Sequence, residues 1–133
     1  MRELSAELKI ELYESAGNAL KHSYCPYSGF QVGAALLTAD GKIFTGINVE
    51  NAAYGASVCA ERTAFVSAVA SGHTEFIALT VLSSEGAVTP CGICRQFIAE
   101  FCSPDFLIMT GDNADNIEEY RLGDLLPDAF SLR

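Results

Sequence analysis

The spacing of hydrophobic residues differs between segments of this 133-residue chain. A four-residue spacing separates Leu4, Leu8, Leu12, Ala16 and Leu20, with glutamates and a lysine between them, which predicts an amphipathic helix across the outside of a core. Residues 30–39 and 42–47 are mostly apolar or β-branched on either side of an Asp-Gly turn signal, so they predict a hairpin. The next segment, 48–56, predicts a loop.

The second half of the chain alternates helical patterns with short apolar runs. Residues 58–70 predict a helix ended by Ser71-Gly72, and residues 91–101 predict another with Pro90 at its start. The runs 76–82 and 106–109 predict strands buried on both faces, and a polar loop at 83–89 leads from the first of them to the helix at 91–101. Residues 117–122 predict a strand and 122–126 a short helical turn. This order predicts an α/β fold in which a mixed sheet lies between helices.

Composition and charge narrow the class of protein. The length fits a single domain over residues 1–133, and half of the residues are hydrophobic, which is enough for a full core. The formal charge is −9, and the eight lysines and arginines are scattered singly, so we expect no nucleic-acid partner. There is no apolar run long enough for a membrane span and no block resembling a signal peptide, so we expect a soluble, cytoplasmic protein without a membrane partner.

Three of the five cysteines have the spacing of metal ligands. Cys59 stands at one predicted helix start, and Cys91 and Cys94 stand at the other within a Pro-Cys-Gly-Ile-Cys run. Unpaired N–H groups and the helix dipole at such starts favour thiolates. Three thiolates can hold Zn²⁺ and leave its fourth position open, as in catalytic zinc sites. We expect Cys25 and Cys102 to be small packing residues instead.

The residues that follow Cys59 predict the rest of the chemistry. Glu61 is the expected proton carrier beside an open metal site. It can approach the same metal as Cys59 only if that metal lies near the helix end, because residues two apart point to opposite sides of a regular helix. Three thiolates give the centre a negative charge, which Arg62 is expected to offset, with Arg95 as a second candidate. A lone Cys-x-x-Cys redox motif would use neither Cys59 nor Glu61.

At this point the chain resembles the cytidine deaminases of the small homotetrameric, three-cysteine zinc type. Five segments carry the resemblance and span nearly the whole chain, namely 25–30 (CPYSGF), 48–51 (NVEN), 59–62 (CAER), 90–96 (PCGICRQ) and 125–130 (LLPDAF). The resemblance implies a three-layer α/β/α sandwich around a central mixed five-stranded sheet. It also implies one Zn²⁺ per subunit and a homotetramer whose sites neighbouring subunits complete. Gly29 is a mild departure, since relatives often have a lysine or another polar residue there.

The resemblance implies roles for further residues. Phe30 would pack on the pyrimidine ring, and Asn48 and Glu50 would hydrogen-bond the ribose hydroxyls. From the sequence alone, a Phe that opens a strand, such as Phe30, is more often a core residue, and Asn48 and Glu50 could be loop-capping residues. The Ala60 N–H would hold the ring carbonyl. Tyr54 would help to build the site of a neighbouring subunit, and Phe130 would cover the pyrimidine there.

The implied activity is hydrolytic deamination of the free nucleosides cytidine and deoxycytidine to uridine and deoxyuridine, a step of pyrimidine salvage. Zinc would acidify a water molecule, and Glu61 would move its proton to N3 and the leaving amine. Two alternatives stay open. One is a deaminase of a modified cytosine nucleoside of the blasticidin S type, and the other is a non-catalytic, zinc-stabilised interaction module, which would have no need of Glu61.

Overall fold

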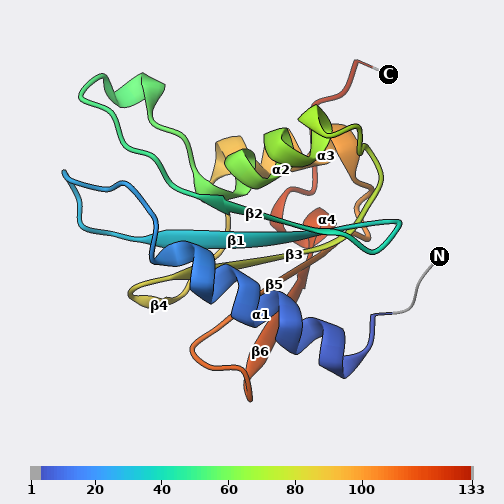
Figure 1. The fold of residues 1–133 in the computed structure, drawn as a ribbon. Coiled ribbons are helices and arrows are strands. Elements are labelled where there is room, and N and C mark those ends of the chain that lie inside the picture. Colours follow the sequence, from blue (N-terminus) through green and yellow to red (C-terminus); the bar gives the residue numbers. More distant parts are fainter. Residues whose placement is uncertain (1–3, 133) are drawn as a thin grey trace.

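The computed structural model describes residues 4–132, and it has the alternating order of helices and strands expected from the sequence (Figure 1). The helices are α1 (Ala6–Leu20), α2 (Ala60–Ala70), α3 (Gly92–Phe101) and α4 (Leu122–Leu125), with a 3-10 turn, η1, at Tyr54–Ala56. The strands are β1 (Val32–Thr38), β2 (Ile43–Ile47), β3 (Phe76–Ser83), β4 (Gly86–Ala87), β5 (Leu107–Gly111) and β6 (Ile117–Arg121). None of these helices is long and apolar enough to cross a membrane.

The strands form one mixed sheet in the order β2-β1-β3-β5-β6, which confirms the predicted α/β class. β1 pairs antiparallel with β2 and β3, β3 pairs parallel with β5, and β5 pairs antiparallel with β6. The sheet also contains β4, which pairs with the end of β3 inside the segment predicted as a loop. Two residues are too few to produce a recognisable alternation, and only their pairing with β3 makes them a strand.

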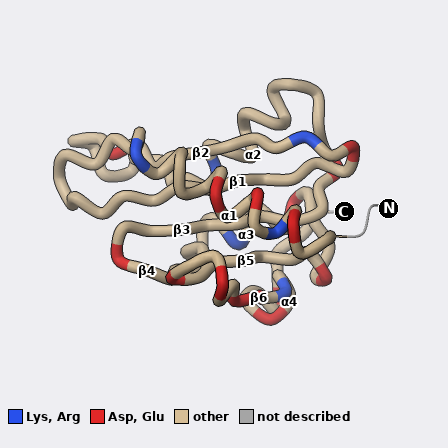
Figure 2. Tube along the Cα trace, turned by 60° about the horizontal axis from the view of Figure 1, so that its bottom comes forward, with Lys and Arg blue, Asp and Glu red and all other residues tan. Residues whose placement is uncertain are grey.

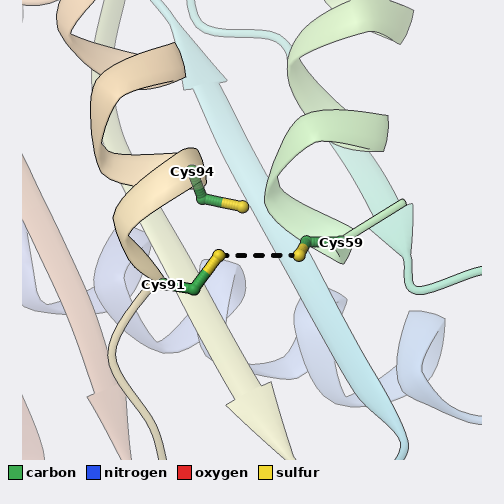
Figure 3. A group of neighbouring side chains, drawn as sticks. All are labelled: Cys59, Cys91 and Cys94. Atoms are coloured by element: carbon green, nitrogen blue, oxygen red, sulfur yellow. Dashed lines mark hydrogen bonds between the residues drawn. The ribbon is translucent and has the colours of Figure 1, made fainter. Parts of the chain in front are cut away.

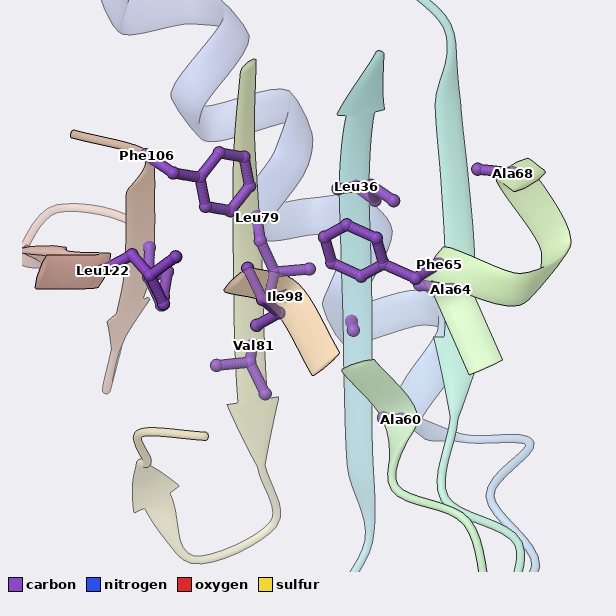
Figure 4. Packing of buried hydrophobic residues seen from close by; sticks show 12 residues of the cluster. Leu36, Ala60, Ala64, Phe65, Ala68, Leu79, Val81, Ile98, Phe106 and Leu122 are labelled. Atoms are coloured by element: carbon purple, nitrogen blue, oxygen red, sulfur yellow. The ribbon is translucent and has the colours of Figure 1, made fainter. Parts of the chain in front are cut away.

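Helices cover both faces of this sheet (Figure 1). Successive side chains of β1 point to opposite sides, so the strand contributes to a core on each face. Leu36 belongs to a buried cluster with Phe65 of α2 and Ile98 of α3 (Figure 4), whereas Leu37 lies with Leu12 of α1 in a second cluster on the other face. The result is the three-layer arrangement that the resemblance implied.

Two glycines set how closely the helices approach the sheet. A Cβ added to Gly46 of β2 would lie 2.2 Å from the carbonyl oxygen of Ala60, and one added to Gly33 of β1 would lie 2.2 Å from that of Ala16. No side chain fits at either position without moving backbone. Gly46 therefore fixes the distance between the sheet and the first turn of α2.

The helix starts differ slightly from the prediction, and the difference places the cysteines. Val58 pairs with Val49 in an isolated bridge, so α2 begins only at Ala60 with Cys59 as its extended N-cap residue. Cys91 is likewise extended and caps α3, which begins at Gly92. The prediction that Pro90 opens the first helical turn is wrong, because the extended backbone of Cys91 separates it from the helix. Both cysteines thus stand at the junction of loop and helix.

Candidate metal centre and substrate cavity

The starts of α2 and α3 bring three cysteine sulfurs together from distant parts of the sequence (Figure 3). The Sγ atoms of Cys59, Cys91 and Cys94 all lie within 4.8 Å of one another, and those of Cys59 and Cys91 are 3.8 Å apart. Within residues 4–132 this is the group of side chains arranged to hold a metal ion.

The spacing of these sulfurs fits a tetrahedral zinc ion. Zn–S bonds of about 2.3 Å at tetrahedral angles separate neighbouring sulfurs by about 3.8 Å. The measured Cys59–Cys91 separation of 3.8 Å matches that value. Cys59 and Cys91 are the N-cap residues of α2 and α3, so an ion held by both would lie near the starts of these helices. The two other cysteines do not join the group. Cys102 packs against the core, where burial raises its pKa to about 12, and Cys25 lies 3.4 Å from the Ser23 hydroxyl.

The local environment favours a thiolate at Cys59. Its pKa is lowered to about 5, first because the Cys94 thiol donates a hydrogen bond to its sulfur and then because Arg62 contributes a hydrogen bond and a positive charge. The pKa of Cys94 is raised for the complementary reason, since its thiol is the donor and its surroundings are desolvated. Metal binding therefore has to displace the proton that Cys94 donates to the Cys59 sulfur.

Arg62 lies beside the sulfur of Cys59. Its Nη2 atom is 3.9 Å from the Cys59 sulfur and donates to the Ser57 carbonyl at 3.4 Å, while its buried Nε atom has no hydrogen-bond partner among the described residues. The second candidate, Arg95, does something different. Its three guanidinium nitrogens donate to the oxygens of Pro90, Leu125 and Thr89, so it is occupied away from the sulfurs.

Glu61 is a buried carboxyl beside the sulfur group. It is 5% exposed, and desolvation by burial, followed by the charge of Cys59, raises its pKa to about 7. A carboxyl that titrates near neutral pH can both accept and return a proton under physiological conditions.

A cavity of about 260 Å³ opens in front of Glu61 and the sulfurs. Its walls combine apolar side chains with a few polar groups, as small-molecule sites do. The structure brings together here most of the residues that the sequence singled out, namely Phe30, Asn48, Glu50, Cys59, Ala60, Glu61 and Cys91. The sequence did not indicate Val32, Ser57, Val58, Val88 and Thr89, which also line it. Three of these are valines, whose apolar side chains carry no chemical signal.

Asn48 and Glu50 also have structural contacts. The Asn48 side chain accepts from the Val32 N–H at 2.9 Å and donates to the Phe30 carbonyl at 2.8 Å. Glu50 accepts hydrogen bonds from the Ser28 hydroxyl and from the backbone N–H groups of Tyr27 and Ser28. Ser28 was not predicted, although its place in a Pro-Tyr-Ser-Gly turn is a signal for such capping. Both side chains therefore hold the loop that carries Phe30, and both still face the cavity.

Tyr54 and Phe130 lie outside this cavity. Tyr54 is 86% exposed on η1, and Phe130 is 70% exposed on the C-terminal segment. The backbone of Phe130 is held by the Gln96 side chain, which donates to its carbonyl at 2.9 Å and accepts from its N–H at 3.1 Å. Neither ring reaches the site of its own chain, so their predicted roles would have to be played toward a neighbouring subunit.

Comparisons with known proteins show the family of this chain. Residues 6–110 match the model of the cytidine and deoxycytidylate deaminase zinc-binding region. The chain is 48% identical over 122 residues to a cytidine deaminase of Sporosarcina psychrophila, covering 91% of this chain and 90% of that protein. It is 44% identical over 121 residues to that of Halalkalibacterium halodurans, covering 90% of this chain and 92% of that one.

Solved structures give the same result for the fold. The crystal structure of cytidine deaminase from Burkholderia pseudomallei superimposes with a TM-score of 0.84 at 47% identity, covering 90% of this chain and 97% of that chain. That of cytidine deaminase from Mycobacterium tuberculosis gives a TM-score of 0.81 at 41% identity, covering 92% and 96%. The enzyme class predicted from the cysteine motifs is thereby confirmed, and the chain belongs to the family of zinc-binding cytidine and deoxycytidylate deaminases.

Proposed function

We propose that this enzyme hydrolyses cytidine and deoxycytidine to uridine and deoxyuridine with release of ammonia, in the cytoplasm and as a step of pyrimidine salvage. The observation that carries the proposal is the buried Glu61 carboxyl placed in one cavity with the ligand sulfurs of Cys59 and Cys91. A purely structural zinc site has no use for a buried acid that titrates near neutral pH.

Cys59, Cys91 and Cys94 hold one Zn²⁺ in each subunit. The ion supplies the Lewis acidity that lowers the pKa of a water molecule toward neutrality. Arg62 offsets part of the negative charge of the three thiolates through its contact with the Cys59 sulfur. The Nε–H of the same guanidinium is buried and has no hydrogen-bond partner within residues 4–132, which supports a role of Arg62 as a positive charge.

Glu61 carries the protons. It accepts one proton of the attacking water and passes it to N3 of the ring as the water oxygen bonds to C4. It then takes the second proton from that oxygen and delivers it to the amine, so that the C4–N bond breaks, the C4 carbonyl forms and ammonia leaves. Its raised pKa suits both directions of transfer, because burial brings the acid and base forms to comparable populations near neutral pH.

The remaining cavity residues bind the nucleoside. The Ala60 N–H is the first of α2 and has no partner within its own helix, so it is free to hold the ring carbonyl. Phe30 packs on the pyrimidine, and the carboxylate of Glu50 and the amide of Asn48 bind the ribose hydroxyls. Lysines and arginines occur singly along the described chain (Figure 2), which gives a phosphate group or a polynucleotide little to bind.

The working form is a homotetramer. Tyr54 and Phe130 are large rings exposed outside the cavity of their own chain, and a neighbouring subunit gives both of them a place to pack. A fully active monomer in sedimentation experiments would refute this part of the proposal.

The test of the function is the loss of ultraviolet absorbance when the enzyme is incubated with cytidine, deoxycytidine or blasticidin S. We expect turnover of the first two substrates, loss of turnover with a chelator, and recovery with zinc. Glu61→Gln should retain zinc and lose activity. Near-normal turnover by this variant with zinc bound would refute the mechanism, and a preference for blasticidin S would refute the substrate assignment.

A further inference from the structure

The segment that leads into Cys91 has little regular structure of its own. It runs from the end of β4 to the start of α3, and Cys91 is the most exposed of the three ligand cysteines. Side chains of other segments hold it through hydrogen bonds to its successive residues. Asp112 accepts from the Ala87 N–H at 2.9 Å, and Thr110 accepts from the Val88 N–H at 3.0 Å. For Thr89 and Pro90, the anchor among the described residues is Arg95.

Arg95 holds the backbone on both sides of Cys91. Its Nε–H donates to the carbonyl of Pro90 at 2.6 Å, and its backbone N–H donates to the carbonyl of Cys91 at 2.9 Å. These two carbonyls belong to the peptide planes before and after the Cys91 Cα atom. The second bond is the first-turn helix bond that any residue at this position would make. The guanidinium therefore restrains the peptide plane before the Cys91 Cα atom, and with it the φ dihedral of the ligand.

The guanidinium is itself held in place. Nη1 donates to the Leu125 carbonyl at 2.8 Å, at the end of α4, and Nη2 donates to the Thr89 hydroxyl at 3.2 Å. Three acceptors in three directions suit the planar fork of an arginine, and the single ammonium of a lysine cannot reproduce them all.

The Cys59 side of the site is built differently. Val58 and Val49 exchange two backbone hydrogen bonds of 2.9 Å, and the Thr63 N–H donates to the Cys59 carbonyl at 3.1 Å. Backbone pairing thus holds the residue before Cys59, whereas the residue before Cys91 depends on a side chain. This asymmetry makes Arg95 the residue whose loss would release one ligand and spare the others.

We propose that Arg95 is a positioning residue that pre-organises Cys91 for the metal and slows the loss of zinc. The inference rests on the zinc site of the proposed function. It differs from charge compensation, because the guanidinium acts on carbonyl and hydroxyl oxygens and leaves the sulfurs to Arg62.

The experiment compares zinc-loaded wild type with Arg95→Ala, Arg95→Lys and a matched control, Arg121→Ala. Arg121 also donates to a backbone carbonyl, that of Asp105 at 3.0 Å, but it lies on β6 away from the cysteines. Zinc release into excess chromogenic chelator is followed at a temperature where circular dichroism shows that every metal-free variant is folded. A second measurement records the d–d bands of the cobalt-substituted proteins.

We expect Arg95→Ala to release zinc about tenfold faster or more, in the range found when residues that support metal ligands are removed. Arg95→Lys should fall between it and the wild type, Arg121→Ala should stay within about twofold of the wild type, and the cobalt bands of both Arg95 variants should shift. Unchanged release and bands would overturn the proposal, and so would metal-free Arg95 variants that do not fold, since Arg95 would then be a structural residue. Failure of the wild type to bind zinc would instead refute the proposed function.

Discussion

Substituting Gly46 with alanine should damage the active site by displacing the first turn of α2. The added Cβ would lie 2.2 Å from the Ala60 carbonyl oxygen, 2.4 Å from the Ala64 nitrogen and 2.5 Å from the Thr63 hydroxyl. An ordinary carbon–oxygen contact is about 3.3 Å, so the first turn of α2 has to move by about 1 Å. That turn carries Cys59 and Glu61 on either side of Ala60.

A displacement of about 1 Å at a catalytic group lowers rates by about 100-fold, and overpacking costs about 1–3 kcal/mol of stability. We therefore expect Gly46→Ala to lose about two orders of magnitude in kcat/KM for cytidine while remaining folded. The assay is the absorbance change on deamination, together with the zinc content and the midpoint of urea unfolding.

Two other glycines provide controls. Gly33→Ala creates the same 2.2 Å contact but displaces α1, which carries no predicted site residue, so its loss of stability should exceed its loss of activity. Gly17→Ala meets only Leu82 at 3.9 Å and should be active and slightly more stable. If Gly46→Ala kept activity within about twofold of the wild type, the argument that a shift of Glu61 by about 1 Å lowers the rate would be wrong.

Three further predictions concern separate features. In the metal-free protein, burial raises the pKa of Glu61 to about 7. The free energy of unfolding of the wild type, relative to that of Glu61→Gln, should therefore fall by about 3 kcal/mol as the pH rises from about 4.5 to 7. Urea titration measures this difference, and a difference that does not change with pH would contradict the raised pKa. Gln96→Ala should free the Phe130 backbone and raise KM for cytidine about fivefold with little change in kcat. The double variant with Phe130→Ala should add nothing to the effect of Phe130→Ala, and additive effects would separate the two residues. The Thr80 hydroxyl is buried and has no hydrogen-bond partner among the described residues, so Thr80→Val should stabilise the protein by about 1 kcal/mol in the same titration, whereas destabilisation would reveal a missed partner.

The elements of this fold follow from local patterns. The spacing of Leu8, Leu12 and Ala16 gives α1, and the apolar runs give β3 and β5, because burial on one or both faces imposes a period on the sequence. The cysteine spacing gives the metal group for a similar reason. A ligand at a helix start and a pair three residues apart are local geometries that the fold only has to bring together.

Contacts between distant segments were not predictable in this way. The close approach of Gly46 to Ala60 depends on how α2 lies on the sheet, and a lone glycine in a strand carries no record of what faces it. The acceptors of Arg95 come from two separate segments, so its sequence position beside Cys94 suggested a role toward the sulfurs that the structure does not give it. The contacts of Tyr54 and Phe130 could not be predicted from local patterns either, because their predicted partners belong to another chain.

The three long helices of this fold begin in two different ways, and the difference follows the chemistry. α1 begins with Ser5, whose hydroxyl accepts from the Leu8 N–H at 3.1 Å, whereas α2 and α3 begin with Cys59 and Cys91 and have no side-chain cap. A capping hydroxyl stabilises a helix by about 1 kcal/mol, and the two helices that give this up are those whose N-cap sulfurs face each other. In the proposed mechanism, the N–H groups and dipoles of these helix starts act on the thiolates and on the substrate carbonyl. α2 and α3 thus lack a capping hydroxyl at the two positions where the proposed active site needs sulfur, whereas α1, which only covers the sheet, has one.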